Sequence, residues 1–203
     1  MAKKLHIAHI ASEVEPFSKS GGLANVIGAL PRAHRELGYE VVVITPYYEN
    51  ITKSDGHTLE IIAENEKIEV SEDTFYTATF LRGTLPYSDV PVYFIASKDF
   101  FGPREKLYNA PNENARFFFF NVAALALLKK IQWTPDILHC HDWHSGLIPY
   151  FLKYRYKKDE FWSNAATVFT IHNLAFQLGH NWWEVSEKDR DDGRSKLPHI
   201  EDS

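Results

Sequence analysis

Two patterns of apolar residues alternate along the chain, one typical of buried strands and the other of helices. Residues 40–46, EVVVITP, form a continuous β-branched run, which indicates a strand buried on both faces. Between residues 22–37 apolar residues recur at helical spacing, and Gly38 follows them as a plausible helix stop. Pro31 lies inside this pattern, so we expect a kink or an irregular turn there. With a first strand at residues 5–11, these segments predict a right-handed βαβ unit.

The middle of the chain has a different pattern. Short β-rich runs, separated by Asp, Gly and Pro, predict hairpins that lead into another core strand; the runs are residues 59–63, 67–70, 75–81 and 92–95. Residues 96–114 contain several Gly, Pro and Asn residues and predict a long loop.

Helical spacing then returns. Residues 115–131 are apolar nearly all round, which predicts a deeply buried helix in which Phe117 to Phe120 belong to the core. Further strands are predicted at residues 136–140 and 166–172, with a loop that becomes a helix over residues 141–156. The order of elements predicts an α/β fold, a mostly parallel sheet with helices on both faces.

Composition and charge limit the class of protein. Of 203 residues, 44% are hydrophobic, enough for one packed domain over residues 1–177; residues 178–203 are highly charged and predict a loop and tail. We do not expect nucleic acid as a partner, because the net charge is -5 and the sequence has no basic stripe. No apolar stretch approaches the roughly 18 residues of a membrane span, and the start of the chain does not resemble a secretory signal. Cys140 is the single cysteine, so no disulfide can form within the chain. We therefore expect a cytoplasmic protein with no membrane partner.

Three polar clusters follow predicted strands, where loops of a parallel sheet converge on one edge. In the first, Gly21 and Gly22 would let a phosphate approach free backbone N–H groups at a helix start, and Lys19 would add a positive charge. The alternative is a tight turn that merely requires glycine. Glu13 and Glu15 could approach the same place or be solvated. Neither a P-loop nor a dinucleotide-binding fingerprint is present.

Histidines dominate the other two clusters. His139, His141, Asp142 and His144 could bind a metal through imidazole nitrogen and carboxylate oxygen. Alternatively, Asp142 contacts a sugar and the histidines are neutral neighbours, or the histidines are simply satisfied core residues. His172, in the last cluster, has the same alternatives of ligand contact and core residue.

Four segments resemble sequence blocks of bacterial glycogen synthases and plant starch synthases. The segments are "SKSGGLANVIGALPRAHRELGYEVVVITPYY", similar to the family's K-x-G-G-L-x-D-V motif, "DILHCHDWHSGLIPYFLK", "VFTIHNLAFQ" and, more weakly, "PVYFIASKDFFGPREKLY". The resemblance covers about residues 4–177. It implies one Rossmann-like lobe of a two-lobe glycosyltransferase.

The resemblance also implies an activity and its residues. The family transfers glucose, with retention, from ADP-glucose or UDP-glucose to the nonreducing end of an α-1,4-glucan, with no metal and no other cofactor. It assigns catalytic positions to Asp142 and His172, the latter with its carbonyl near the anomeric centre. It assigns substrate contacts to Lys19, Gly21, Gly22, Asn25, His141 and Asn173.

Two positions depart from the family pattern. Asn25 replaces the aspartate of the glycine motif, and Ala96 replaces the aspartate of a "YFID" sequence. The 203 residues also leave no room for a second lobe, so we expect a truncated enzyme with little turnover alone. Two alternatives remain: a non-catalytic glucan-binding or regulatory module with the same fold, and a metal-dependent hydrolase built on the histidine cluster.

Overall fold

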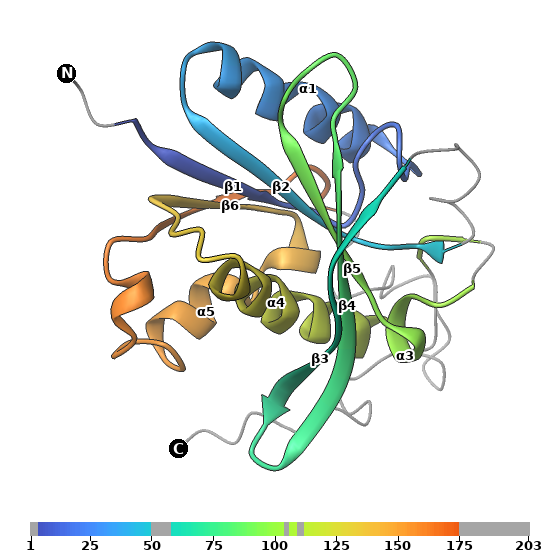
Figure 1. The fold of residues 1–203 in the computed structure, drawn as a ribbon, viewed down its shortest axis with the longest axis vertical. Coiled ribbons are helices and arrows are strands. Elements are labelled where there is room, and N and C mark those ends of the chain that lie inside the picture. The colour runs from blue at the N-terminus through green and yellow to red at the C-terminus, as the bar shows by residue number, and fades with distance from the viewer. Residues whose placement is uncertain (1–3, 50–57, 104–105, 109–111, 175–203) are drawn as a thin grey trace.

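The computed structural model describes residues 4–49, 58–103, 106–108 and 112–174, and these form a seven-stranded sheet with helices on both faces (Figure 1). The strands are β1 (His6–Ile10), β2 (Glu40–Pro46), β3 (Glu60–Ser71), β4 (Thr74–Thr84), β5 (Pro91–Ala96), β6 (Ile137–His141) and β7 (Ala166–Thr170). The helices are α1 (Gly22–Glu36), α3 (Lys98–Phe101), α4 (Glu113–Lys130) and α5 (Ile148–Lys153), with 3₁₀ turns η1 (Trp143–Ser145) and η2 (Glu160–Trp162).

The strand order is β3-β4-β5-β2-β1-β6-β7. Neighbours from β5 to β7 are parallel, whereas β3 and β4 are antiparallel additions at one side. The prediction of a mostly parallel α/β sheet is therefore confirmed. At the other side β7 is an edge strand within the described residues, and its Val168 and Phe169 are each 43% exposed.

The central position of β2, covered on both faces, explains its unbroken apolar sequence. Val41 and Val43 belong to the hydrophobic cluster beneath α1, whereas Val42 and Ile44 belong to the cluster beneath α4 and α5. Because successive side chains point to opposite faces, helices on both faces require apolar residues at every position.

Helix α1 differs from its prediction at one point. It continues through Pro31 to Glu36 without the irregular turn that we expected. Pro31 itself is buried against the sheet. Gly38 has φ +91°, which confirms the predicted stop, since this conformation favours glycine.

The middle of the chain differs more. The predicted runs 59–63 and 67–70 are not separate hairpin strands, because residues 60–71 form the single strand β3, which pairs along β4 with register shifts that include those around Ala63 and Glu66. Asn65, with φ +54°, lets the strand pass this irregularity. Within the predicted loop, α3 forms because Phe100 packs on Phe119 of α4, with ring centroids 4.5 Å apart.

Helix α4 is buried nearly all round, as predicted. Phe117, Phe119 and Phe120 are at most 2% exposed, and Phe118 packs partly buried against the same cluster. Although α4 is long and apolar, none of the helices in the described residues meets the length and hydropathy required to cross a membrane. The prediction of a tail at residues 178–203 lies outside the described residues.

Candidate active site

The predicted site residues follow β1, β6 and β7, which are adjacent parallel strands. Their carboxyl ends therefore lie on one edge of the sheet. The loop after β1 carries the glycine turn, Asp142 follows β6, and His172 follows β7.

Asp142 and His172 are in direct contact. Asp142 Oδ1 accepts a hydrogen bond from the backbone N–H of His172 at 2.6 Å, and the Asp142 N–H donates to the Thr170 carbonyl at 2.9 Å. Asp142 has φ +57° and ψ 176°, a conformation that costs a non-glycine residue about 1–3 kcal/mol. The two hydrogen bonds hold this backbone, and they place the carboxylate of Asp142 against the loop that carries His172.

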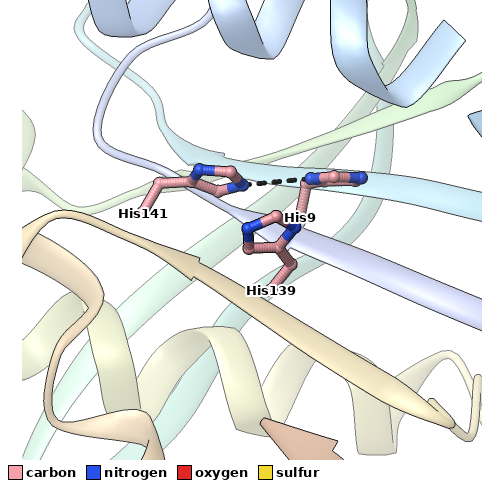
Figure 2. A group of neighbouring side chains, drawn as sticks. All are labelled: His9, His139 and His141. Carbon is pink, nitrogen blue, oxygen red and sulfur yellow. Dashed lines mark hydrogen bonds between the residues drawn. The ribbon is translucent and has the colours of Figure 1, made fainter. Parts of the chain in front are cut away.

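His141, the residue before Asp142, contacts another histidine through each of its two ring nitrogens. Its Nδ1 is 3.0 Å from Nε2 of His172, and its Nε2 is 3.0 Å from Nδ1 of His9. His139 lies beside His9 and His141 and stacks on His141, with ring centroids 4.0 Å apart (Figure 2). Nε2 of His139 is 2.8 Å from the hydroxyl of Thr170. The prediction that His139 and His141 point to the same side is confirmed.

The environment of His9, His139 and His141 favours the neutral imidazole, because it lowers the pKa of each ring. Burial lowers the pKa of His9 well below its usual value, and it lowers the pKa of His141 to about 2. The pKa of His139 is lowered to about 4, again chiefly by burial. The neighbouring imidazoles add to each shift, because a second positive charge in the cluster would be repelled.

One group of described residues has the composition of a metal site: His9, His139 and His141 each offer a nitrogen, all within 4.8 Å of one another. Three nitrogens around tetrahedral zinc, at about 2.0–2.1 Å from the ion, would lie roughly 3.4 Å apart. Nδ1 of His9 and Nε2 of His141 instead lie 3.0 Å apart, a hydrogen-bond distance, so this pair uses its nitrogens on each other. This geometry is that of a hydrogen-bonded cluster.

The four residues considered for a metal from the sequence do not come together. His144 packs on the opposite face, against Phe117 of α4 with ring centroids 4.5 Å apart, whereas His139 and His141 face α1. The oxygen Oδ1 of Asp142 accepts from the His172 amide. The ligand set of the metal-dependent hydrolase hypothesis is therefore wrong, because the chain leaves β6 at Asp142 and the turn η1 carries His144 to the α4 face.

The glycine turn is not required by packing. Gly21 precedes α1 with φ -152°, an extended conformation open to any residue. A Cβ on Gly22 would meet no atom within 4 Å, and one on Gly21 would meet only Glu13 Oε1, at an ordinary 3.7 Å. The alternative of a tight turn that requires glycine is therefore not supported. The N–H groups of the first turn of α1 have no side-chain cap.

Two acidic residues flank this turn. Glu13 is buried, and its Oε2 accepts from the N–H of Ser20 at 2.5 Å. Glu15 pairs with Lys19 at 3.0 Å, with both side chains nearly half exposed. Lys19 thus reaches the rim of the turn as a charge that solvent can approach. Asn25 and Asn173 are exposed residues of the same edge.

A hollow of about 380 Å³ lies elsewhere, in the antiparallel part of the sheet. It is lined by Phe17, Thr58, Glu60, Arg82, Gly83 and Thr84. None of the predicted site residues lines it. We place the candidate site at the carboxyl edge, where the polar groups converge.

Sequence reasoning did not identify His9 and His34 as hydrogen-bonded neighbours of the site histidines. His9 pairs in register with His139, and its Nε2 is 3.1 Å from Nδ1 of His34 on α1. The order β2-β1-β6 and the register of β1 against β6 bring these rings together, and neither can be read from local sequence.

Comparison with known proteins identifies the family. The family model described as the starch synthase catalytic domain matches residues 6–199. The chain belongs to this family. It is 40% identical over 181 residues to a glycogen synthase of Geotalea daltonii, and 35% identical over 191 residues to one of Photobacterium profundum. These matches cover 85% and 90% of the chain but only 36% of each relative.

A solved structure supports the same assignment. The chain is similar to the catalytic domain of starch synthase IV from Arabidopsis thaliana bound to ADP and acarbose, with a TM-score of 0.74 and 31% identity. The match covers 84% of this chain and 34% of the plant chain. This starch synthase family chain therefore spans about a third of the length of the relatives that it matches.

Proposed function

We propose that this chain is the N-terminal lobe of a retaining glucosyltransferase that transfers glucose from ADP-glucose or UDP-glucose to an α-1,4-glucan. The observation that carries the proposal is the contact between Asp142 and His172 on the sheet edge that also bears the glycine turn. In parallel sheets, ligands bind at this edge.

The proposed roles follow from the charge that develops during transfer. The leaving nucleoside diphosphate gains negative charge, which backbone N–H groups at a helix start and a mobile cation stabilise. The open space at Gly22 suits the first role, and the half-exposed side chain of Lys19, whose Nζ pairs with the equally exposed Glu15, suits the second. Asp142 and His172 then face the transferring glucose, with His141 fixing the ring of His172 from beneath.

The ligands in the related plant structure agree with this class of substrate. That catalytic domain is bound to ADP and acarbose. For this chain we propose a nucleotide donor and a glucan acceptor, with Asn25 and Asn173 as further contacts at the exposed edge.

We expect little turnover from the 203 residues alone. The part of each relative that this chain does not cover, nearly two thirds, would supply the opposing lobe that excludes water and grips the diphosphate. Loss of such a clamp costs on the order of 10³-fold in rate.

The proposal is tested with a chimera in which this chain is joined to the uncovered part of the Geotalea daltonii glycogen synthase. We expect the chimera to extend maltooligosaccharides from ADP-glucose, and Asp142→Ala or His172→Ala to lower kcat by about 10²–10³-fold. Lys4→Ala is the control, because Lys4 pairs with Glu40 at the opposite end of β1. A folded chimera without transferase activity, or one indifferent to both substitutions, would contradict the proposal.

The non-catalytic glucan-binding module is the second candidate. It is motivated by Asn25, exposed in the first turns of α1, where the family motif has an aspartate. Calorimetric titration of the chain separates the two candidates. Maltooligosaccharide binding without any binding of ADP or ADP-glucose would favour the module, and nucleotide binding would favour the transferase lobe.

A further inference from the structure

Four histidines form a continuous chain of hydrogen bonds through the α1 face of the sheet. Nδ1 of His34 lies 3.1 Å from Nε2 of His9, Nδ1 of His9 lies 3.0 Å from Nε2 of His141, and Nδ1 of His141 lies 3.0 Å from Nε2 of His172. Every contact joins an Nδ1 to an Nε2. The chain runs from partly exposed His34 on α1, through two fully buried rings, to partly exposed His172 at the candidate site.

This repeated order constrains the protons. A neutral imidazole carries one N–H and one bare nitrogen, so each hydrogen bond needs N–H on one ring and a bare nitrogen on the next. If Nδ1 of His34 carries the proton, Nε2 of His9 is bare and its Nδ1 must carry one, and the same holds for His141 and His172. If Nε2 of His172 carries the proton, the argument runs in reverse. All four rings therefore share one tautomer.

We propose that His34, His9, His141 and His172 form a proton relay, in which His34 on α1 sets the tautomer of His172 and so decides whether Nδ1 of His172 donates or accepts a hydrogen bond at the candidate site. With Nδ1–H throughout, His172 presents a donor, suited to a hydroxyl or phosphate oxygen. With Nε2–H throughout, it presents an acceptor, suited to a hydroxyl proton. His34 and His9 are positioning residues in this scheme, because they act through His141.

The neighbouring groups described below do not fix the tautomer of the four rings. The tautomer is therefore set at the two ends of the relay, at His34 and His172. Asp142 accepts from the backbone N–H of His172, and the side-chain hydroxyl of Thr170 contacts Nε2 of His139, which is not one of the four rings. On α1, the neighbouring Arg35 is paired with Asp89 and Glu40. Tyr39 meets His34 through ring edges, with centroids 6.2 Å apart. His139 stacks on His9 and His141 and, as another imidazole, opposes a second proton in the cluster.

The same geometry allows a proton to be transferred from His34 to the candidate site while the four rings stay in place. A proton that binds Nε2 of His34 releases the Nδ1 proton of His34 to His9, that of His9 to His141, and that of His141 to His172. His172 then loses its own Nδ1 proton to the acceptor at the site. One proton enters, one leaves, and all four rings change from the Nδ1–H to the Nε2–H tautomer.

The test uses nitrogen-15 NMR of the purified 203-residue chain at pH 8, where neutral rings report their tautomer directly. In the unmodified chain we expect the same tautomer at all four rings. His34→Lys puts a donor-only group at the end of the relay, and His34→Glu puts an acceptor-only group there; both residues form helices well. We expect Lys to favour Nδ1–H at His172 and Glu to favour Nε2–H, each by about tenfold, equivalent to about 1.4 kcal/mol.

His6 provides the matched control. It is the first residue of β1, its Nδ1 contacts the Thr134 carbonyl, and it is outside the relay. His6→Lys and His6→Glu should leave the tautomer of His172 unchanged. Mixed tautomers among the four rings of the unmodified chain would overturn the proposal even if the variants fail to fold. Identical His172 tautomers in the two His34 variants would also overturn it.

The relay itself does not depend on the proposed function; only the meaning of the His172 tautomer for a sugar or phosphate rests on it. The two can fail separately. If the tautomers are coupled but no active chimera can be made, the relay still holds. If the chimera transfers glucose but the tautomers are not coupled, the transferase function still holds.

Discussion

Acid should unfold this protein at an unusually mild pH, because it buries neutral histidines. His9 and His141 are fully buried and His144 is 7% exposed. Burial, chiefly, lowers the pKa of His141 to about 2 and that of His144 to about 3, and it lowers the pKa of His9 well below its usual value. In the unfolded chain each regains a pKa near 6.5. Between these values the unfolded state binds more protons, so stability falls as the pH drops below 6.5.

The size of this loss of stability follows from the linkage between proton binding and folding. Each histidine that stays neutral in the folded state costs about 1.36 kcal/mol per pH unit once the pH is well below 6.5. At pH 5 this is about 2 kcal/mol for each group that is still neutral in the folded state, and several times that amount when all of them are. Since domains of this size are stable by about 5–15 kcal/mol, the loss approaches the whole stability.

Urea unfolding followed by circular dichroism, repeated from pH 8 to pH 5, measures this loss. We expect the free energy of unfolding to be nearly constant above pH 7 and to fall by several kcal/mol by pH 5. His144→Phe keeps the packing against Phe117 and Trp143 and removes one titrating group, so it should remove about 2 kcal/mol of the loss. Tyr154→Phe, at a 60% exposed position, should leave the pH dependence unchanged. A free energy of unfolding that is flat from pH 8 to pH 5 would refute the assignment of buried neutral histidines.

The remaining predictions concern the candidate site. Gly22→Ala should leave the free energy of unfolding unchanged or raise it by about 0.4–1 kcal/mol, while weakening ADP binding in a calorimetric titration; unchanged binding would contradict the role of the open space. Gly28→Ala, whose Cβ would lie 3.1 Å from the Glu15 carbonyl oxygen, should destabilise instead. Asp142→Ala should be less stable than Asp142→Gly by about 1–3 kcal/mol in urea unfolding, because both lose the carboxylate but only alanine keeps the backbone strain. Lys19→Ala should change stability by less than about 1 kcal/mol yet weaken ADP binding at low salt, whereas Lys4→Ala should change neither greatly.

The sequence allowed the main elements to be predicted where one interaction dominates. Buried β-branched runs such as residues 40–46 have few alternatives to a central strand, and the all-apolar α4 has few alternatives to a buried helix. The common edge of β1, β6 and β7 followed from their parallel arrangement alone. The contact of Asp142 with His172 could be expected on this basis.

What could not be predicted depends on register and on distant packing. His9 joins the histidine cluster because it lies opposite His139, and His34 joins it because α1 packs on the face of the sheet to which the His9 ring points. No local pattern marks either residue. Helix α3 is similar, since its four residues are helical through contacts with α4. The position of Asn65 in β3 required a backbone conformation that polar sequence alone does not reveal.

Strand β7 has a consequence for how the protein behaves in solution. Within the described residues it pairs only with β6, and its exposed Val168 and Phe169 flank a row of backbone groups that can still form a ladder. An exposed edge strand with apolar side chains can template the addition of a further strand. The sheet can therefore lengthen at β7, whether with more of its own polypeptide or with a neighbouring molecule that competes for the same place.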